Sequence, residues 1–401
     1  MALKALNYIL KIPIYLILLV ILYLNISLYG TQDYNKSKGY DEDVYAQLQH
    51  LKHEMHDNNA GVNMQSIFPE GFVFQNALYG LTWCDLVNDK TDPKIKEEAI
   101  KEIDWALDEI HSTTGKAIFD PNLPLRYGVF YRGWENYLLA KRLTIGSSTS
   151  TQKKLFIDNC REITSAYDSS STPYLESYRN ASWPADNLLA VASIALRDKI
   201  TYESHPPKSP IKRWVEMTKQ HLDENGLIPH STNAQTGKTN QKAKGNSQSL
   251  ILCLLKDIDS SFANEQFAIY KKLYLDSRLG LPGIRENMMG EGGGGDIDSG
   301  PVIWDIGGAA SIVGQKTMAT FGEWDTYHGL RNSIEAFGCA YTWSGKKKYV
   351  FGAMPMADAF IAWSNASAHE YEVQSGNWRW KFQLISLGLS FILILLIRRL
   401  K

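Results

Sequence analysis

A polar turn followed by an apolar run recurs six times along the chain. Each turn contains Gly, Pro or Asp, each run is strongly apolar, and successive starts lie 52 to 63 residues apart. Charged, amphipathic segments with helical apolar spacing, such as residues 94–112, separate the runs. A repeat of this length accommodates one pair of antiparallel helices. The six starts are Phe68, Tyr131, Trp183, Lys244, Asp296 and Pro355.

Six helical hairpins predict an all-α fold, the (α/α)6 toroid. Its inner helices touch both the outer helices and one another, so they must be apolar on more than one side, whereas an outer helix needs one apolar stripe. Parallel inner helices gather their N-terminal turns at one end. We therefore expect the six polar turns to surround one funnel, where helix N-termini add partial positive charge and free N–H groups.

Both ends of the chain read as membrane-spanning helices. Residues 12–30 are almost wholly apolar, and residues 382–397 are apolar between two tryptophans and a basic terminus. The first stretch is long enough to cross a bilayer. The alternatives are a cleaved signal peptide, although no small-x-small cleavage site is visible, and a buried C-terminal helix.

Basic residues predict the orientation of these two helices. Lys4 and Lys11 precede the first, and Arg398, Arg399 and Lys401 follow the second, so the positive-inside rule puts both termini in the cytoplasm. We thus expect an N-terminal anchor over residues 1–30, an (α/α)6 domain over 31–377 and a C-terminal membrane helix over 378–401. The domain would lie outside the cytoplasm, in the periplasm or cell envelope.

The composition limits the classes of binding partner that we expect. A net charge of −1 gives no field that would attract nucleic acid, so we expect the lipid bilayer and a glycan or small-molecule substrate as partners. The sequence leaves open whether the protein forms a homo-oligomer. The cysteines have neither CxxC nor zinc spacing and lie in apolar runs, so we expect small buried hydrophobic residues, and no metal or cofactor. They are Cys84, Cys160, Cys253 and Cys339.

Four segments, residues 130–146, 183–196, 226–252 and 296–313, resemble the linalool dehydratase/isomerase family. The resemblance implies an (α/α)6 barrel that is exported or tethered to a membrane. Within the first segment, the family's Y-[KR]-G-x-x-N turn is matched by Tyr131, Arg132, Gly133 and Asn136.

The family's catalytic residues are not matched. Asp186 and Asn187 correspond to the P-D-N turn, but the catalytic histidine falls on Trp134 and the two cysteines fall on Trp183 and Ala192. The resemblance therefore implies a shared pocket with different chemistry.

The polar turns contribute several carboxylates. Two acids facing each other across a pocket can act as general acid and general base when burial or a neighbouring charge keeps one of them protonated. We predict Asp186 and Asp298 as this catalytic pair, with Asp296 as a third candidate. The alternative is that each only caps a helix.

Aromatic and amide side chains in the same turns suggest a carbohydrate cleft. Aromatic faces stack on sugar rings and amides bind hydroxyl groups, but any polar-mouthed apolar pocket has a similar lining. The predicted substrate-binding residues are Glu70, Tyr131, Arg132, Trp134, Trp183, Asn187, Asn246, Gln248 and Asp358.

The segment GEGGGGDIDSGP, residues 290–301, lacks the Gly-Lys-Ser/Thr of a phosphate-binding loop and the closing Glu of a calcium loop. We predict a rim loop that ends in the cap of the fifth inner helix. Gly292 to Gly295 would allow positive φ and let the loop move as a lid.

Three functions follow from these observations. The first is an extracytoplasmic enzyme that uses carboxylate acid/base chemistry on an envelope or exported glycan, as a hydrolase, lyase or epimerase. The second is a lyase or isomerase of a small apolar alcohol. The third is a non-catalytic binding protein of the cell envelope.

Overall fold

The computed structural model describes residues 2–29, 34–35, 38–200, 210–367 and 377–400. Gly30, the predicted end of the N-terminal anchor, and Lys401 lie outside these ranges. The described residues form sixteen α-helices, one short 3-10 helix and five two-stranded antiparallel hairpins. The predicted all-α class is confirmed.

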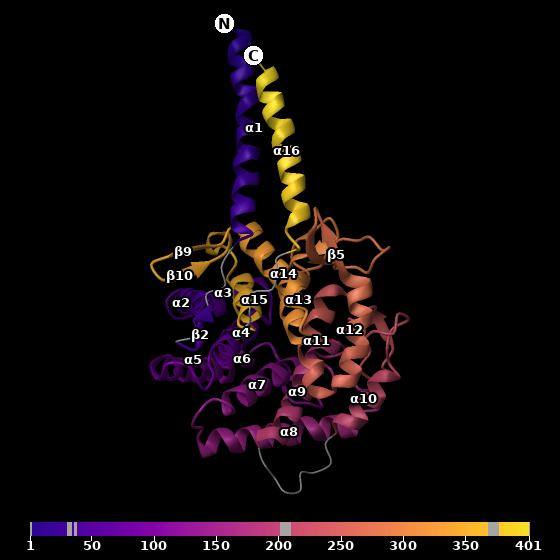
Figure 1. The fold of residues 1–401 in the computed structure, drawn as a ribbon. Helices are drawn as coiled ribbons and strands as arrows, with labels where there is room; N and C mark the ends of the chain where they lie inside the picture. The colour runs from indigo at the N-terminus through magenta and orange to yellow at the C-terminus, as the bar shows by residue number, and fades with distance from the viewer. Residues whose placement is uncertain (1, 30–33, 36–37, 201–209, 368–376, 401) are drawn as a thin grey trace.

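Six helices form a closed inner ring. Each packs on the next along the chain, and the last packs on the first, so that they surround a common centre (Figure 1). They are α4 (Gly71–Leu86), α7 (Gly128–Leu143), α9 (Pro184–Ile200), α11 (Gly245–Ile258), α13 (Gly308–Thr320) and α15 (Pro355–Asn365).

An outer helix packs on each inner helix. Five of them follow their inner partner in the chain, whereas the sixth, α2 (Glu42–His56), comes from the start of the domain and packs on α15. The first helix of the domain thus completes the last hairpin, and the predicted (α/α)6 toroid is confirmed. The other five are α5 (Pro93–His111), α8 (Ser150–Ser169), α10 (Ile211–Lys219), α12 (Ser260–Tyr274) and α14 (Trp324–Phe337).

Burial separates the two layers as the sequence pattern predicts. Fourteen of the sixteen residues of α4 are buried, and so are fourteen of the sixteen residues of α7. The outer helix α8 buries only five of its twenty residues, on one stripe. Polar residues within an inner helix, such as Asn76 of α4 and Glu135 and Asn136 of α7, are therefore buried and need partners inside the fold.

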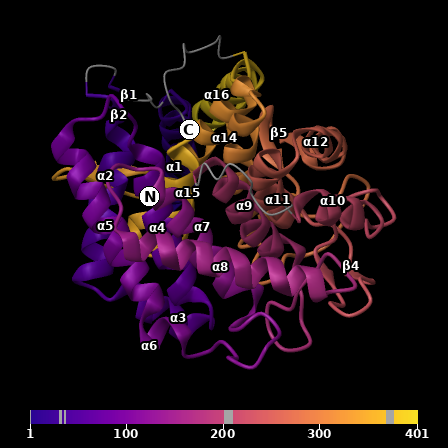
Figure 2. The same cartoon turned by 90° about the horizontal axis from the view of Figure 1, so that it is seen from below.

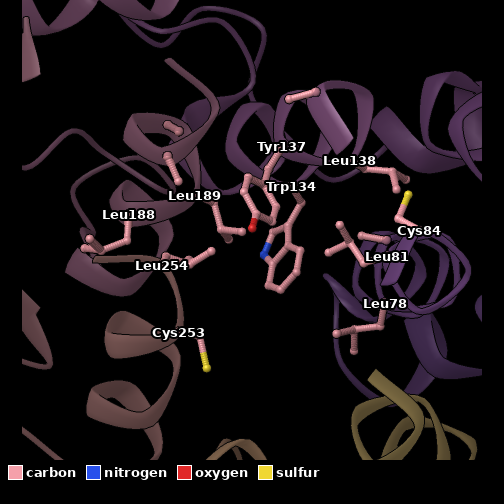
Figure 3. Close-up of a cluster of buried hydrophobic side chains, with 14 of the residues drawn as sticks. Leu78, Leu81, Cys84, Trp134, Tyr137, Leu138, Leu188, Leu189, Cys253 and Leu254 are labelled. Atoms are coloured by element: carbon pink, nitrogen blue, oxygen red, sulfur yellow. The ribbon is translucent and has the colours of Figure 1, made fainter. Parts of the chain in front are cut away.

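The centre of the ring is filled with apolar side chains. Figure 3 shows Trp134 of α7 between Leu78 and Leu81 of α4 and Leu189 and Leu254 of α9 and α11. Trp134 is fully buried. Its predicted place on the funnel surface is wrong, because the side chain points into the core below the funnel.

The connections from an outer helix to the next inner helix carry the additional elements. They are α3 (Ala60–Ile67), α6 (Thr113–Lys116), β3–β4 (Ser231–Thr232, Thr239–Gln241), β5–β6 (Leu275–Arg278, Leu281–Ile284), β7–β8 (Val302–Ile303, Ile306–Gly307), β9–β10 (Tyr341–Trp343, Lys346–Lys348) and the 3-10 helix η1 (Val350–Gly352). A further hairpin, β1–β2 (Tyr34–Asn35, Tyr40–Asp41), precedes α2. Because inner helices begin where these connections end, the elaborated loops form the rim of one end of the ring.

The terminal helices α1 (Ala2–Ser27) and α16 (Trp380–Arg399) pack on each other and project from the domain beside α14 (Figure 1). By length and composition, Ile9–Ser27 and Trp380–Arg399 could each cross a membrane, with mean hydropathies of 2.4 and 2.0. Figure 2, seen from below, has α8 nearest the viewer, so α8 lies on the side of the domain away from these helices.

The fifth inner helix differs from the prediction. The helix α13 begins at Gly308 rather than close to Asp298, because the β7–β8 hairpin lies between them. Asp296 and Asp298 therefore belong to a loop and cap no inner helix. Positive φ occurs at Gly290 and Gly300 instead of Gly292 to Gly295, so the four central glycines do not use the conformational freedom expected of them.

Three of the four cysteines fit the prediction of small buried hydrophobic residues. Cys84, Cys160 and Cys253 are buried, but Cys339 is exposed beyond the end of α14, and all four are free thiols.

Candidate functional site

Asp186 lies in the first turn of α9 and is 8% exposed. The loop before it folds back through a Tyr178–Ala181 bridge, which brings the Ser177 hydroxyl within 2.6 Å of one carboxylate oxygen of Asp186 as a hydrogen-bond donor. Gly133 of α7 lets the two helices approach here, since a Cβ at that position would lie 3.0 Å from the backbone oxygen of Asp186. Two helices and one turn thus fix this carboxyl group.

Burial dominates the titration of Asp186. Removal from water raises its pKa to about 8, the Ser177 hydrogen bond opposes the shift, and the charges of Glu70 and Asp298 add to it. Within the described ranges Ser177 is the only hydrogen-bond partner of this carboxyl group. Asp186 therefore holds a proton at neutral pH.

Asp298 belongs to the loop that follows the glycine run, and its side chain is exposed. Its own N–H donates to Asp296 over 3.1 Å, which orients the turn. Surrounding protein atoms, then the charges of Asp296 and Glu70, raise its pKa to about 6, whereas Lys244 lowers it. Because water reaches the side chain and screens these charges, Asp298 is mainly ionised at neutral pH.

Glu70 completes a group of three acids. It immediately precedes α4, is partly buried, and raises the pKa of Asp186, Asp298 and the Tyr178 phenol. The Tyr178 hydroxyl faces Glu70 but is buried with no partner at hydrogen-bonding geometry among the described residues. The Trp183 ring lies 5.7 Å from the Tyr178 ring at 82°. Three acids from three segments thus lie close enough for their charges to interact, near two aromatic rings.

Asp296 is held firmly in its ionised form. Burial alone would raise its pKa, but the ion pair with Lys244 and the 2.8 Å hydrogen bond donated by Ser299 lower it to about 2. Asp296 also accepts the N–H groups of Ser299 and Asp298, both at 3.1 Å. With its oxygens engaged in this way, Asp296 is placed to position Asp298 rather than to exchange protons.

Two further polar residues, which are not among the predicted site residues, adjoin this loop. Glu286 is 1% exposed, accepts a 2.7 Å hydrogen bond from Ser299, and keeps one oxygen without a partner in the described chain. Burial raises the pKa of Glu286. His230 is buried against Ser247, and burial followed by the Lys244 charge lowers its pKa to about 4. Both depend on partners far away in sequence, so no local motif identifies them.

Several predicted binding residues point away from the acids. The Tyr131 hydroxyl donates to the Ile110 backbone oxygen at 3.0 Å, and Arg132 forms ion pairs with Glu135 and with Glu162 of the outer helix α8. Both side chains therefore connect α7 to the outer layer instead of lining the funnel.

Two other predicted residues, Asn187 and Gln248, make structural contacts. Asn187 accepts hydrogen bonds from Tyr167 and from the Leu175 N–H, both at 2.8 Å, and thereby ties the preceding loop to α9. The Gln248 amide donates to the Ile228 backbone oxygen at 2.6 Å.

Asp358 accepts the Tyr349 N–H at 2.8 Å and lies 3.6 Å from His50 of α2. It therefore joins α15 to the outer layer. Asn246 is partly buried, with its side-chain oxygen accepting the Ser247 N–H, and it lies at the margin of the Glu286 network.

Comparisons with known proteins add little to this geometry. No family model matches the chain, and no curated protein matches it. A solved structure of the GH76 alpha-mannanase of Bacteroides thetaiotaomicron is similar with 10% identity and a TM-score of 0.44, over 74% of this chain and 86% of that chain. The resemblance to the linalool dehydratase/isomerase family stays a prediction, and the toroid rests on the helix contacts described above.

Proposed function

We propose that the protein is a membrane-anchored enzyme that acts on a glycan, with Asp186 as general acid and Asp298 as general base. One observation carries the proposal: Asp186 is buried with Ser177 as its hydrogen-bond donor, and it interacts electrostatically with Asp298 on an exposed loop. Burial raises the pKa of Asp186 to about 8, whereas that of Asp298 is raised to about 6. At neutral pH the first is protonated and the second mainly ionised, which is the division of labour that acid/base catalysis requires.

The arrangement suits hydrolysis of a glycosidic bond. Asp186 would give its proton to the leaving oxygen as the bond to the anomeric carbon breaks. Asp298 would take a proton from the water molecule whose oxygen bonds to that carbon. In a lyase or epimerase, Asp298 would instead take the proton from carbon. Trp183, partly exposed beside Tyr178, would offer its ring to the sugar, and Glu70 would offer an acceptor for the hydroxyl groups of the sugar.

The membrane placement forms part of this proposal. The helices α1 and α16 would span the bilayer, with both termini in the cytoplasm and the toroid outside it. Aromatic and basic side chains at their base support this, because Arg379 stacks 4.0 Å above the Tyr29 ring and 5.1 Å from the Trp378 ring. Such groups favour the level of the lipid headgroups.

A screen of polysaccharides and oligosaccharides with the full-length protein tests the chemistry. New reducing ends report hydrolysis, and absorbance of unsaturated products reports lyase action. On any substrate that is converted, Asp186→Asn and Asp298→Asn should each lower the rate by about 10²- to 10⁴-fold. Asp158→Asn, an exposed site on α8, is the control. Wild-type rates in both variants would refute the catalytic pair, whereas a screen in which every compound survives intact would favour a binding protein.

A further inference from the structure

Large apolar residues occupy strained backbone positions on the surface. Leu279, Trp304, Val350 and Phe351 all have positive φ, between 46° and 60°. They are 46%, 65%, 42% and 72% exposed, in the same order. Gly or Asn normally fills such positions, because bulky and β-branched residues are disfavoured there. These side chains neither relax the backbone nor gain burial, so stability of the domain does not account for them.

Two of these positions adjoin the base of α16. The β5–β6 turn, at Leu279 and Gly280, touches the first turn of α16, since a Cβ at Gly280 would lie 2.4 Å from Lys381 Cβ. Arg278 donates a 2.8 Å hydrogen bond to the Trp304 backbone oxygen, which joins the β7–β8 turn to the same place. Figure 1 shows β5 beside the base of α16.

The other two positions lie beyond the end of α14. Val350 donates its N–H to the Gly338 backbone oxygen over 2.7 Å, and Ala336, two residues before Gly338, packs with Leu28, which directly follows α1. The adjacent β9–β10 hairpin exposes 78% of Trp343. Figure 1 shows this hairpin on the opposite side of the terminal helices from β5. Exposed apolar residues therefore flank the terminal helices on both sides.

We propose that these apolar tips dock on the bilayer surface that holds α1 and α16. The tips are Leu279, Ile303, Trp304, Trp343, Val350 and Phe351. The occupant is lipid because the surface is continuous with the two candidate spans. Basic side chains also accompany it: Arg278 holds the Trp304 turn, and Lys348 lies 5.4 Å from the Tyr341 ring. Aromatic rings backed by cations are suited to the headgroup region.

Docking of these tips would affect the candidate site through the loop that carries Asp298. Asp298 lies on the segment that leads into the β7–β8 tip, and the next strand of that hairpin leads directly into α13. A Trp304 held at the bilayer therefore constrains the loop that supplies the base, and it favours a glycan presented at the membrane surface. This inference rests on the membrane placement proposed above.

Fluorescence in nanodiscs tests the docking. The full-length protein with Cys339→Ser, whose remaining thiols are buried, would carry an environment-sensitive thiol label at Trp304→Cys, Ile303→Cys or Trp343→Cys. Leu389→Cys on α16 is the positive control and Arg161→Cys on α8 the negative control. Phosphatidylcholine with nitroxide-bearing acyl chains is the quencher. We expect quenching at the three tip positions and at position 389, but none at position 161.

The possible outcomes distinguish docking of the tips on the bilayer from insertion of α16 into it. If position 389 is quenched while the three tips behave like position 161, docking is overturned and the anchor stands. If position 389 also escapes the quencher, the membrane placement itself fails. Ile303→Cys retains Trp304 and its turn, so a local effect of replacing Trp304 cannot produce the result alone. The readout needs no substrate, and it therefore does not depend on the proposed catalysis.

Discussion

Two buried acids at the same end of the ring behave in opposite ways. Glu135 of α7 is 2% exposed and Asp186 of α9 is 8% exposed, and burial pushes the pKa of both upward. His111 at 2.8 Å and Arg132 at 2.8 Å reverse the shift for Glu135 and lower its pKa. Asp186 has only the Ser177 hydroxyl and two further acids nearby, so its pKa stays high.

The comparison shows that, for two carboxyl groups of similar burial, the partners decide the direction in which the pKa shifts. Glu135 is committed to an ion-pair network that joins α7 to the outer layer. Asp186 has no cationic partner among the residues that the structure describes, and it keeps its proton available. The following predictions test this contrast, in order of decreasing effect.

Glu135→Gln should destabilise the fold by about 3 kcal/mol, since it leaves Arg132 and His111 without their shared buried partner. The value lies at the low end for a buried pair because Glu162 still pairs with Arg132. Thermal or urea unfolding in detergent measures it. Glu162→Gln removes the more exposed partner and should cost less than about 1 kcal/mol. Equal losses in both variants would contradict the network.

Asp186→Asn should change the pH dependence of stability. Wild-type Asp186 ionises at about 3.9 when unfolded but only near 8 when folded, so the folded state alone holds the proton between these values. Its contribution to stability is complete at low pH and falls as pH rises, by about 1.4 kcal/mol per unit across that window. Asparagine removes this slope.

Melting temperatures of both proteins at pH 5 and pH 8 provide the measurement for Asp186. The difference between variant and wild type should grow in favour of the variant at pH 8. Asp158→Asn should keep the wild-type slope, and parallel curves for Asp186→Asn and wild type would show that Asp186 is not held neutral.

Ser177→Ala should move the alkaline limb of the pH–rate profile upward. The wild-type rate should rise as Asp298 ionises near pH 6 and fall as Asp186 loses its proton near pH 8. The Ser177 hydrogen bond favours the charged form of Asp186, and its loss is worth about 1 kcal/mol, less than one pH unit. A shift of the acidic limb instead would assign the roles of the two acids in reverse.

Lys244→Gln should produce the smallest effect, an upward shift of the acidic limb. The Lys244 charge favours ionised Asp298, so removing it raises the pKa of that group. Lys242→Gln, on an exposed neighbour that pairs with Glu224 and Glu291, should leave the profile unchanged. Identical pH–rate profiles for the two variants would show that the Lys244 charge does not act on Asp298.

The ring of inner helices could be predicted because each helix is marked by a pattern of neighbouring residues in the sequence. An apolar run after a polar turn is visible in sequence, and α4, α7, α9, α11 and α15 begin close to their predicted starts. The exception is α13, because the sequence pattern predicts residues 301–306 as part of this helix, whereas the helix begins at Gly308. The turn at Trp304 and Asp305, with φ of 50° and 68°, makes this segment a hairpin. Neither turn residue is Gly or Asn, so the sequence contains no typical signal for a turn with positive φ.

The site could be predicted only in part, because sequence gives the turn but not the direction of each side chain. Asp186 and Asp298 lie close enough for their charges to interact, as a pair at one site requires, and their catalytic roles stay a prediction. Arg132 and Asp358, predicted from equivalent turns, face the outer layer instead. The partners that set the pKa values were missed. Ser177 lies nine residues from Asp186, and Lys244 lies 52 residues from Asp296.

The pairing of α2 with α15 also determines when the domain can be completed during synthesis. Asn365 donates a hydrogen bond to Gln47 across 318 residues, and Arg331 reaches Asp41 across 290. The apolar stripe of α2, including Val44, Leu48 and Leu51, has to wait for almost the whole chain before it is covered. Such long-range closure is slow, so the nascent domain leaves the apolar stripe of α2 uncovered by α15 until the last hairpin is translated.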